Sequence, residues 1–74
     1  MNTKSINLLY NYVIIDENYC VTGAVTYSCE VPLDNYITVS DARDEYIGKY
    51  YNSEDGLFYY DTEYTQIFNI EDVI

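Results

Sequence analysis

The side chains of this chain that can do chemistry are carboxylates, phenols and two thiols. Thirteen Asp and Glu residues and eleven tyrosines accompany Cys20 and Cys29, and there is no histidine. Histidine is the commonest general base near neutral pH and the commonest zinc ligand, so both roles lose their usual residue. Without a neighbouring base, neither cysteine is activated as a nucleophile. The residue types therefore argue against an enzyme.

The carboxylates are numerous, but their spacing does not indicate a catalytic pair or a metal loop. Adjacent acids occur at Asp44–Glu45, Glu54–Asp55 and Glu71–Asp72. Neighbouring side chains of a strand point to opposite faces, so such pairs do not form acid–base dyads. From Asn52 to Glu63 the chain has the length of a calcium-binding loop, but Gly56 falls one position too early. We expect no catalytic residue, no metal site and no cofactor.

The net charge of −10 is the strongest indication of a partner. Nucleic acid and anionic membranes repel such a surface, because each phosphate contact needs a cation. A basic protein surface attracts it and is reached faster. Solubility needs a net charge of only roughly 2–8 in a small domain, so this charge exceeds that need. We expect a basic protein partner, with no direct nucleic-acid contact and no membrane.

The candidate partner-binding residues are acids and tyrosines in the second half of the chain. They are Asp41, Asp44, Glu45, Glu54, Asp55, Asp61 and Glu63, together with Tyr46, Tyr50, Tyr51, Tyr59 and Tyr60. The acids would supply charge, and the tyrosines would supply contact area and cation–π contacts to Arg and Lys. Reversing Glu54 and Asp55 to Lys is expected to abolish binding and to leave the fold intact. The alternative, that these acids are solvated and spread around the surface, stays open.

The positions of apolar residues predict a mainly β (α+β) fold. Residues 7–15 form an apolar run typical of a strand covered on both faces, and residues 16–18 form a turn. Residues 19–28 continue as the second strand of a hairpin, where Gly23 indicates a bulge. Further strands are expected at residues 36–39, 49–51, 57–60 and 63–68. The sum is an antiparallel meander of five or six strands in a single domain, residues 1–74.

One short helix is expected near residues 41–47. Ser40 or Asp41 can cap its first turn, and Gly48 can end it. No signal peptide and no membrane span are recognisable, so we expect a cytoplasmic protein with two reduced, buried thiols. A chain of 74 residues has a small core, so a homodimer or stabilisation by a partner is expected.

Three stretches of the chain resemble short phage proteins from Gram-positive hosts. The stretches are IIDENYCVTGAV, EVPLDNYITV and DEYIGKYYNSEDGLFYY. Those proteins begin with an aspartate-containing hairpin, which is followed by an acidic segment, a further stretch and a final turn. The counterpart of the further stretch runs here from Asp44 to Tyr51. The match covers about residues 12–60. The resemblance implies phage or prophage origin, and therefore a host-cell cytoplasm. Such proteins are tail or appendage components or small stand-alone proteins.

These observations lead to a functional hypothesis and to alternatives. The first is a non-catalytic phage-encoded inhibitor. It would bind the basic nucleic-acid channel of a host defence nuclease or CRISPR effector, as an anti-CRISPR protein or DNA mimic does. The second is a structural tail or appendage subunit that forms a homo-oligomer. A domain with an unrelated regulatory partner is the third.

Overall fold

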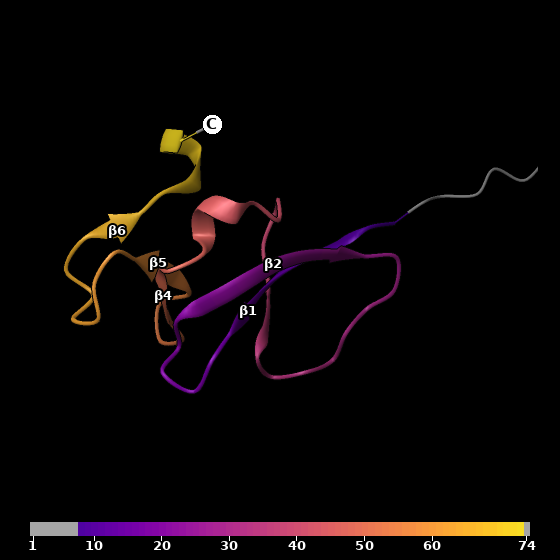
Figure 1. The fold of residues 1–74 in the computed structure, drawn as a ribbon, viewed down its shortest axis with the longest axis horizontal. Coiled ribbons are helices and arrows are strands. Elements are labelled where there is room, and N and C mark those ends of the chain that lie inside the picture. Colours follow the sequence, from indigo (N-terminus) through magenta and orange to yellow (C-terminus); the bar gives the residue numbers. More distant parts are fainter. Residues whose placement is uncertain (1–7, 74) are drawn as a thin grey trace, which may run out of the picture.

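The structure, a computed structural model, describes residues 8–73 and is mainly β. Its elements are β1 (Tyr10–Ile15), β2 (Val21–Tyr27), β3 (Tyr36–Thr38), the 3₁₀ helix η1 (Asp44–Tyr46), β4 (Tyr50–Asn52), β5 (Leu57–Tyr59), β6 (Ile67–Phe68) and the 3₁₀ helix η2 (Ile70–Val73). The strands form two three-stranded antiparallel sheets, ordered β2-β1-β3 and β4-β5-β6 (Figure 1). The predicted mainly β class and its antiparallel strands are confirmed.

β1 is the central strand of the first sheet and is covered on both faces. Val13 is fully buried, and with Ile15 it joins the hydrophobic core. Successive side chains alternate between faces, so Tyr12 points to the other face. There its ring packs against Tyr36 at 5.8 Å and Tyr27 at 6.5 Å between centroids. The apolar residues from Tyr12 to Ile15 fit this position because side chains on both faces of the strand are buried or half-buried.

A β-bulge bends the hairpin next to Gly23, as the sequence predicted. Ile14 lies opposite Gly23, but Ile15 lies opposite Val21, so Thr22 is the extra residue on β2. Such a bulge increases the local twist and redirects the strand. The first residue of β2, Val21, precedes the bulge and leads towards the second sheet.

Backbone hydrogen bonds between the start of β2 and β4 join the two sheets. Cys20 and Tyr50 form an isolated antiparallel bridge. The N–H of Tyr51 donates to the carbonyl of Tyr19 at 2.9 Å, and the N–H of Val21 donates to the carbonyl of Lys49 at 2.8 Å. In Figure 1, β4 lies beside the end of the hairpin at which β2 begins.

The strand order of the first sheet differs from the predicted meander. β3 pairs with β1, where Val13 lies opposite Ile37, instead of with the preceding strand β2. The connection over residues 28–35 is too long for a tight turn, and it crosses to the far side of β1. Two hydrogen bonds fix its path. The hydroxyl of Tyr12 accepts a hydrogen bond from the N–H of Val31 at 2.9 Å, and the N–H of Ile15 donates to the carbonyl of Asn35 at 2.9 Å. The meander order holds for β4-β5-β6.

The predicted helix is shorter than residues 41–47. It is a single 3₁₀ turn, with Arg43 at its N-cap and no side-chain cap from Ser40 or Asp41. The N–H of Ile47 donates to Asp44 at 2.9 Å, three residues back, and Gly48 follows at a φ of 89°. A turn of this length is enough to bury the ring of Tyr46.

The last strand is also shorter than predicted, because a loop replaces most of residues 63–68. β6 is only Ile67–Phe68. The preceding residues are held in a turn in which Tyr64 has a φ of 59°. A positive φ breaks the extended run that the alternating sequence indicated.

Both sheets contribute to one hydrophobic core. The cluster comprises Val13, Ile15, Val21, Tyr46, Phe58 and Phe68. The centroid of the Tyr46 ring lies 4.9 Å from that of Phe58 and 5.4 Å from that of Phe68. The side chain of Tyr46 therefore connects η1 to the core that the two sheets share. The thiols are not part of this core. Cys20 is half-buried and Cys29 is exposed, and both are free, so the prediction that they are buried is wrong.

Candidate functional site

The carboxylates lie on the surface. All thirteen fall within residues 8–73, and every one is exposed except Asp61, which is half-buried. Of the two basic residues in this part of the chain, Arg43 pairs with its neighbours. Its Nε lies 3.3 Å from Glu45, and its Nη1 lies 3.9 Å from Asp41. The hydrogen bond from Arg43 lowers the pKa of Glu45, and the coulombic effect of Lys49 acts in the same direction.

The other basic residue, Lys49, is also engaged inside the fold. Its Nζ donates a hydrogen bond to the carbonyl of Glu45 at 3.0 Å. The same atom lies 4.8 Å from the ring centroid of Phe68 and 5.2 Å from that of Tyr60, which are cation–π distances. Both cations of the described part therefore already have intramolecular partners, whereas most carboxylates face solvent.

Asp55 organises the turn between β4 and β5. Its carboxylate accepts hydrogen bonds from the N–H of Leu57 at 2.9 Å, from the amide of Asn52 at 3.4 Å and from the hydroxyl of Tyr59. An acid with three donors is part of the fold. Reversal of Asp55 would disrupt this turn, so the expectation of an intact fold now applies to Glu54 alone.

Asp61 has the same kind of role in the loop between β5 and β6. It accepts the hydroxyl of Thr65 at 2.5 Å, the N–H of Thr65 at 3.0 Å and the N–H of Gln66 at 3.1 Å. The hydroxyl of Thr65 is the largest cause of the lowered pKa of Asp61, and the backbone N–H groups add to it. Asp61 is therefore the acid that shortens β6.

The remaining predicted acids lie in three places. Asp44 is the first residue of η1, and Asp41 lies three residues before it. Glu54 lies in the turn between β4 and β5, and Glu63 lies in the loop between β5 and β6. The antiparallel order places the latter two at opposite ends of β5. β5 itself spans about 10 Å, and Glu54 lies three residues before it and Glu63 four residues after it.

The five predicted tyrosines divide by burial. Tyr46 and Tyr59 are only 5% and 6% exposed, so their rings belong to the fold. Tyr50 and Tyr51 are half-buried in β4, opposite Tyr59 and Phe58. Tyr60 is 51% exposed and is the one of the five that presents much of its ring to solvent.

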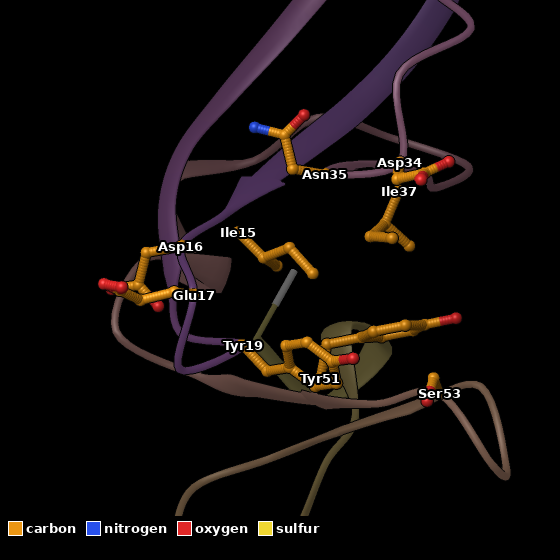
Figure 2. Close-up of a pocket in the computed structure, with 9 residues that line it drawn as sticks. All are labelled: Ile15, Asp16, Glu17, Tyr19, Asp34, Asn35, Ile37, Tyr51 and Ser53. Carbon is orange, nitrogen blue, oxygen red and sulfur yellow. The ribbon is translucent and has the colours of Figure 1, made fainter.

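A groove of about 530 Å³ lies where the β1–β2 turn approaches β3 and β4 (Figure 2). Its lining residues are Ile15, Asp16, Glu17, Tyr19, Asp34, Asn35, Ile37, Tyr51 and Ser53, and we call it the Tyr19 groove. Figure 2 shows Ile15 and Ile37 across from Tyr19 and Tyr51, with Asp16 and Glu17 at one end and Asp34 at the other. The lining thus combines apolar and aromatic walls with acidic ends.

The turn that carries Tyr19 is held by Asp16. The carboxylate of Asp16 accepts the N–H of Asn18 at 2.8 Å and that of Cys20 at 3.0 Å. The N–H of Tyr19 donates to the carbonyl of Asp16 at 2.9 Å, and Tyr19 has a φ of 65°. This is a type I turn followed by a left-handed residue, a position at which glycine is favoured. A tyrosine there is sterically unfavourable and 42% exposed.

Among the groove residues, the sequence analysis identified only Tyr51 as a candidate. Asp16 was interpreted as part of a turn, and Tyr19 as the start of a strand. The signal that was available is the type of residue at the third loop position, where Tyr replaces the usual glycine. Asp34 and Ile37 had no local signal, because they reach the groove only through the crossing of the chain to β3.

Residues 8–73 thus form a small, mainly β fold with an acidic surface and an aromatic groove. Within residues 8–73 there is no group of three or more metal-binding side chains. No helix in that part of the chain is long and apolar enough to cross a membrane. No protein-family model matches the chain, and no curated protein or solved structure matches it either.

Proposed function

We propose that this protein is a non-catalytic binding protein that docks on the basic, nucleic-acid-binding surface of another protein. The observation that carries the proposal is the imbalance of charge at the surface. Twelve carboxylate residues are exposed, whereas Arg43 and Lys49 are both engaged within the fold. A basic groove that accepts phosphates presents the complementary charge.

The partner-facing acids in this proposal are Asp41, Asp44, Glu45, Glu54 and Glu63. Glu54 and Glu63 are the best to test, because both are exposed and their side chains accept no hydrogen bond among residues 8–73. Exposed charges act over about 8 Å at physiological ionic strength. Binding therefore weakens as salt rises, and charge reversal at these two positions lowers the association rate most.

The target we propose is a host defence nuclease or a CRISPR effector, and the proposed origin is a phage. This part of the proposal is supported by the resemblance of residues 12–60 to short phage proteins. In it, the protein acts in the host cytoplasm and competes with nucleic acid for the effector's channel. Its carboxylates take the place of phosphates there, and exposed phenols such as Tyr60 contact Arg and Lys side chains.

The test is a pull-down from nuclease-treated bacterial lysate with the tagged protein, followed by mass spectrometry. It compares the wild type with Glu54→Lys/Glu63→Lys, and with Glu54→Gln/Glu63→Gln as the matched control. We expect a basic nucleic-acid-binding protein that is recovered at low salt, released at high salt and lost with the Lys variant. The Gln variant should retain part of the binding. The purified partner should then release bound duplex when this protein is added.

Recovery of the protein alone, indifferent to salt and to charge reversal, would contradict the proposal. It would favour the second candidate, a structural subunit that self-associates. Exposed apolar side chains on the outer face of the second sheet support that candidate. Leu57 is 42% exposed and Ile67 is 57% exposed, and the register places both on the face that carries Tyr59. A monomer in sedimentation velocity, absent from purified phage particles, would exclude it.

A further inference from the structure

The Tyr19 groove combines features that match one kind of occupant. Its apolar and aromatic walls come from Ile15, Ile37, Tyr19 and Tyr51. Within residues 8–73, the lining includes the acids Asp16, Glu17 and Asp34 and no basic side chain. An occupant that gains from both features has a flat or apolar body and a positive charge.

We propose that the Tyr19 groove receives an arginine side chain from the partner protein, together with the backbone segment that carries it. The inference rests on the proposed function, because it supposes a basic protein partner. A guanidinium stacks on aromatic faces and pairs with carboxylates, whereas an ammonium is a more strongly hydrated point charge. Asp34 at one end and Glu17 at the other provide the carboxylates, because that of Asp16 already accepts two backbone N–H groups.

The size of the groove fits more than an isolated side chain. A volume of about 530 Å³ lies within the roughly 300–1,000 Å³ of typical ligand sites. The arginine therefore enters with flanking residues, whose apolar atoms cover half-buried Ile37 and the exposed part of Tyr19. Removing this apolar surface from water adds affinity that does not depend on salt. The groove thus supplies specificity, while the remaining surface acids supply attraction over a distance.

The occupant lies against residues that the fold holds in place. Tyr51 belongs to β4, and its ring packs against Phe58 at 5.1 Å between centroids. The backbone of Tyr19 is fixed by the turn that Asp16 organises and by the hydrogen bond that its carbonyl accepts from the N–H of Tyr51. Preformed rings lose little conformational freedom on binding, and this favours recognition.

The test uses three synthetic octapeptides of one sequence, with arginine, lysine or the neutral isostere citrulline at every basic position. Their binding to the isotopically labelled full chain is followed by NMR, at low salt. With the arginine peptide, we expect saturable shifts at the amides of Tyr19, Asp34 and Tyr51. The lysine peptide should bind several-fold more weakly, and the citrulline peptide should give no saturable shift.

Two groove variants and one control variant separate this inference from the proposed function. Tyr19→Gly and Asp34→Asn should each weaken binding of the arginine peptide about two- to fivefold, as expected for one exposed cation–π contact or ion pair. Glu71→Gln, which removes a charge in η2 outside the groove, should leave affinity within a factor of about two. If the peptide binds in a salt-dependent way but both groove variants bind like the wild type, the inference is wrong and the proposed function stands. If no basic peptide or protein binds at low salt, both are wrong.

Discussion

The hydroxyl of Tyr59 donates a hydrogen bond to the carboxylate of Asp55, and this contact ties β5 to the turn that precedes it. The hydrogen bond is the largest cause of a raised pKa of Tyr59, and burial adds to it. The same carboxylate accepts the N–H of Leu57, so one acid holds both the turn and the strand. Tyr59 and Asp55 are of the residue types expected at a binding surface, but their side chains bind each other within the fold.

Folding stability should fall at alkaline pH in a way that depends on this pair. The pKa of Tyr59 in the folded protein lies above its ordinary value of 10.0. Stability from this group is therefore complete below pH 10.0 and is lost as the pH rises through the folded value. Tyr59→Phe and Asp55→Asn should both flatten this decline in urea unfolding measured over a series of alkaline pH values. An equally steep decline in both variants would show that the pair does not cause it.

The loss of folding stability at acidic pH should depend on Asp61. Its pKa lies below its ordinary value of 3.8, mainly because of the hydroxyl of Thr65. The stability that it contributes is present above pH 3.8 and is lost as the pH falls through the folded value. Asp61→Asn should lower the urea midpoint at neutral pH and flatten the dependence in acid. Glu63→Gln is the matched control, because it removes one negative charge two residues away and none of these hydrogen bonds.

The sequence predicted what local pattern can encode. The hairpin of β1 and β2, the bulge beside Gly23 and the turn before β5 all follow from apolar runs and turn residues. The pairing of β3 with β1 did not, because it depends on a connection that Tyr12 and Val31 hold across nineteen positions. Short strands with non-local partners carry little signal of their own.

The candidate site was less predictable than the fold. Composition correctly places carboxylates on the surface, but it cannot tell a solvated acid such as Glu54 from an acid such as Asp55 that accepts three hydrogen bonds. The Tyr19 groove is built from residues 15–19, 34–37 and 51–53, which meet only in the folded chain. The only local indication of this groove in the sequence is Tyr19, a tyrosine at a loop position where glycine is usual.

The core should not tolerate truncation at Phe58. This ring lies 4.9 Å from that of Tyr46 and 5.1 Å from that of Tyr51, and it is 8% exposed. Phe→Ala in a core costs about 3–5 kcal/mol, which equals the net stability of roughly 3–5 kcal/mol expected at this size. Phe58→Ala should therefore lose its NMR chemical-shift dispersion.

The neighbouring residue provides the control for Phe58. Leu57→Ala removes an exposed side chain from the opposite face of β5, so its stability should change by about 0.5 kcal/mol or less. A well-dispersed spectrum of Phe58→Ala would mean that the two sheets do not depend on a common core. Unfolding of Leu57→Ala would mean that the outer face of the second sheet is covered in solution, as in the self-associating alternative.

Substitutions of Tyr19 should separate stability from binding. At a φ of 65°, a side chain with a Cβ costs about 1–2 kcal/mol, whereas glycine costs only its greater chain entropy of roughly 0.5–1 kcal/mol. Tyr19→Gly should therefore be as stable as the wild type or more stable by about 0.5 kcal/mol in urea unfolding. Tyr19→Ala keeps the unfavourable backbone and loses the ring, so it should be the less stable of the two variants. Both should bind the arginine peptide more weakly, because neither has the ring. If Tyr19→Gly is instead less stable than the wild type, the ring contributes more to the fold than the backbone conformation costs, and the case for a ring exposed for binding fails.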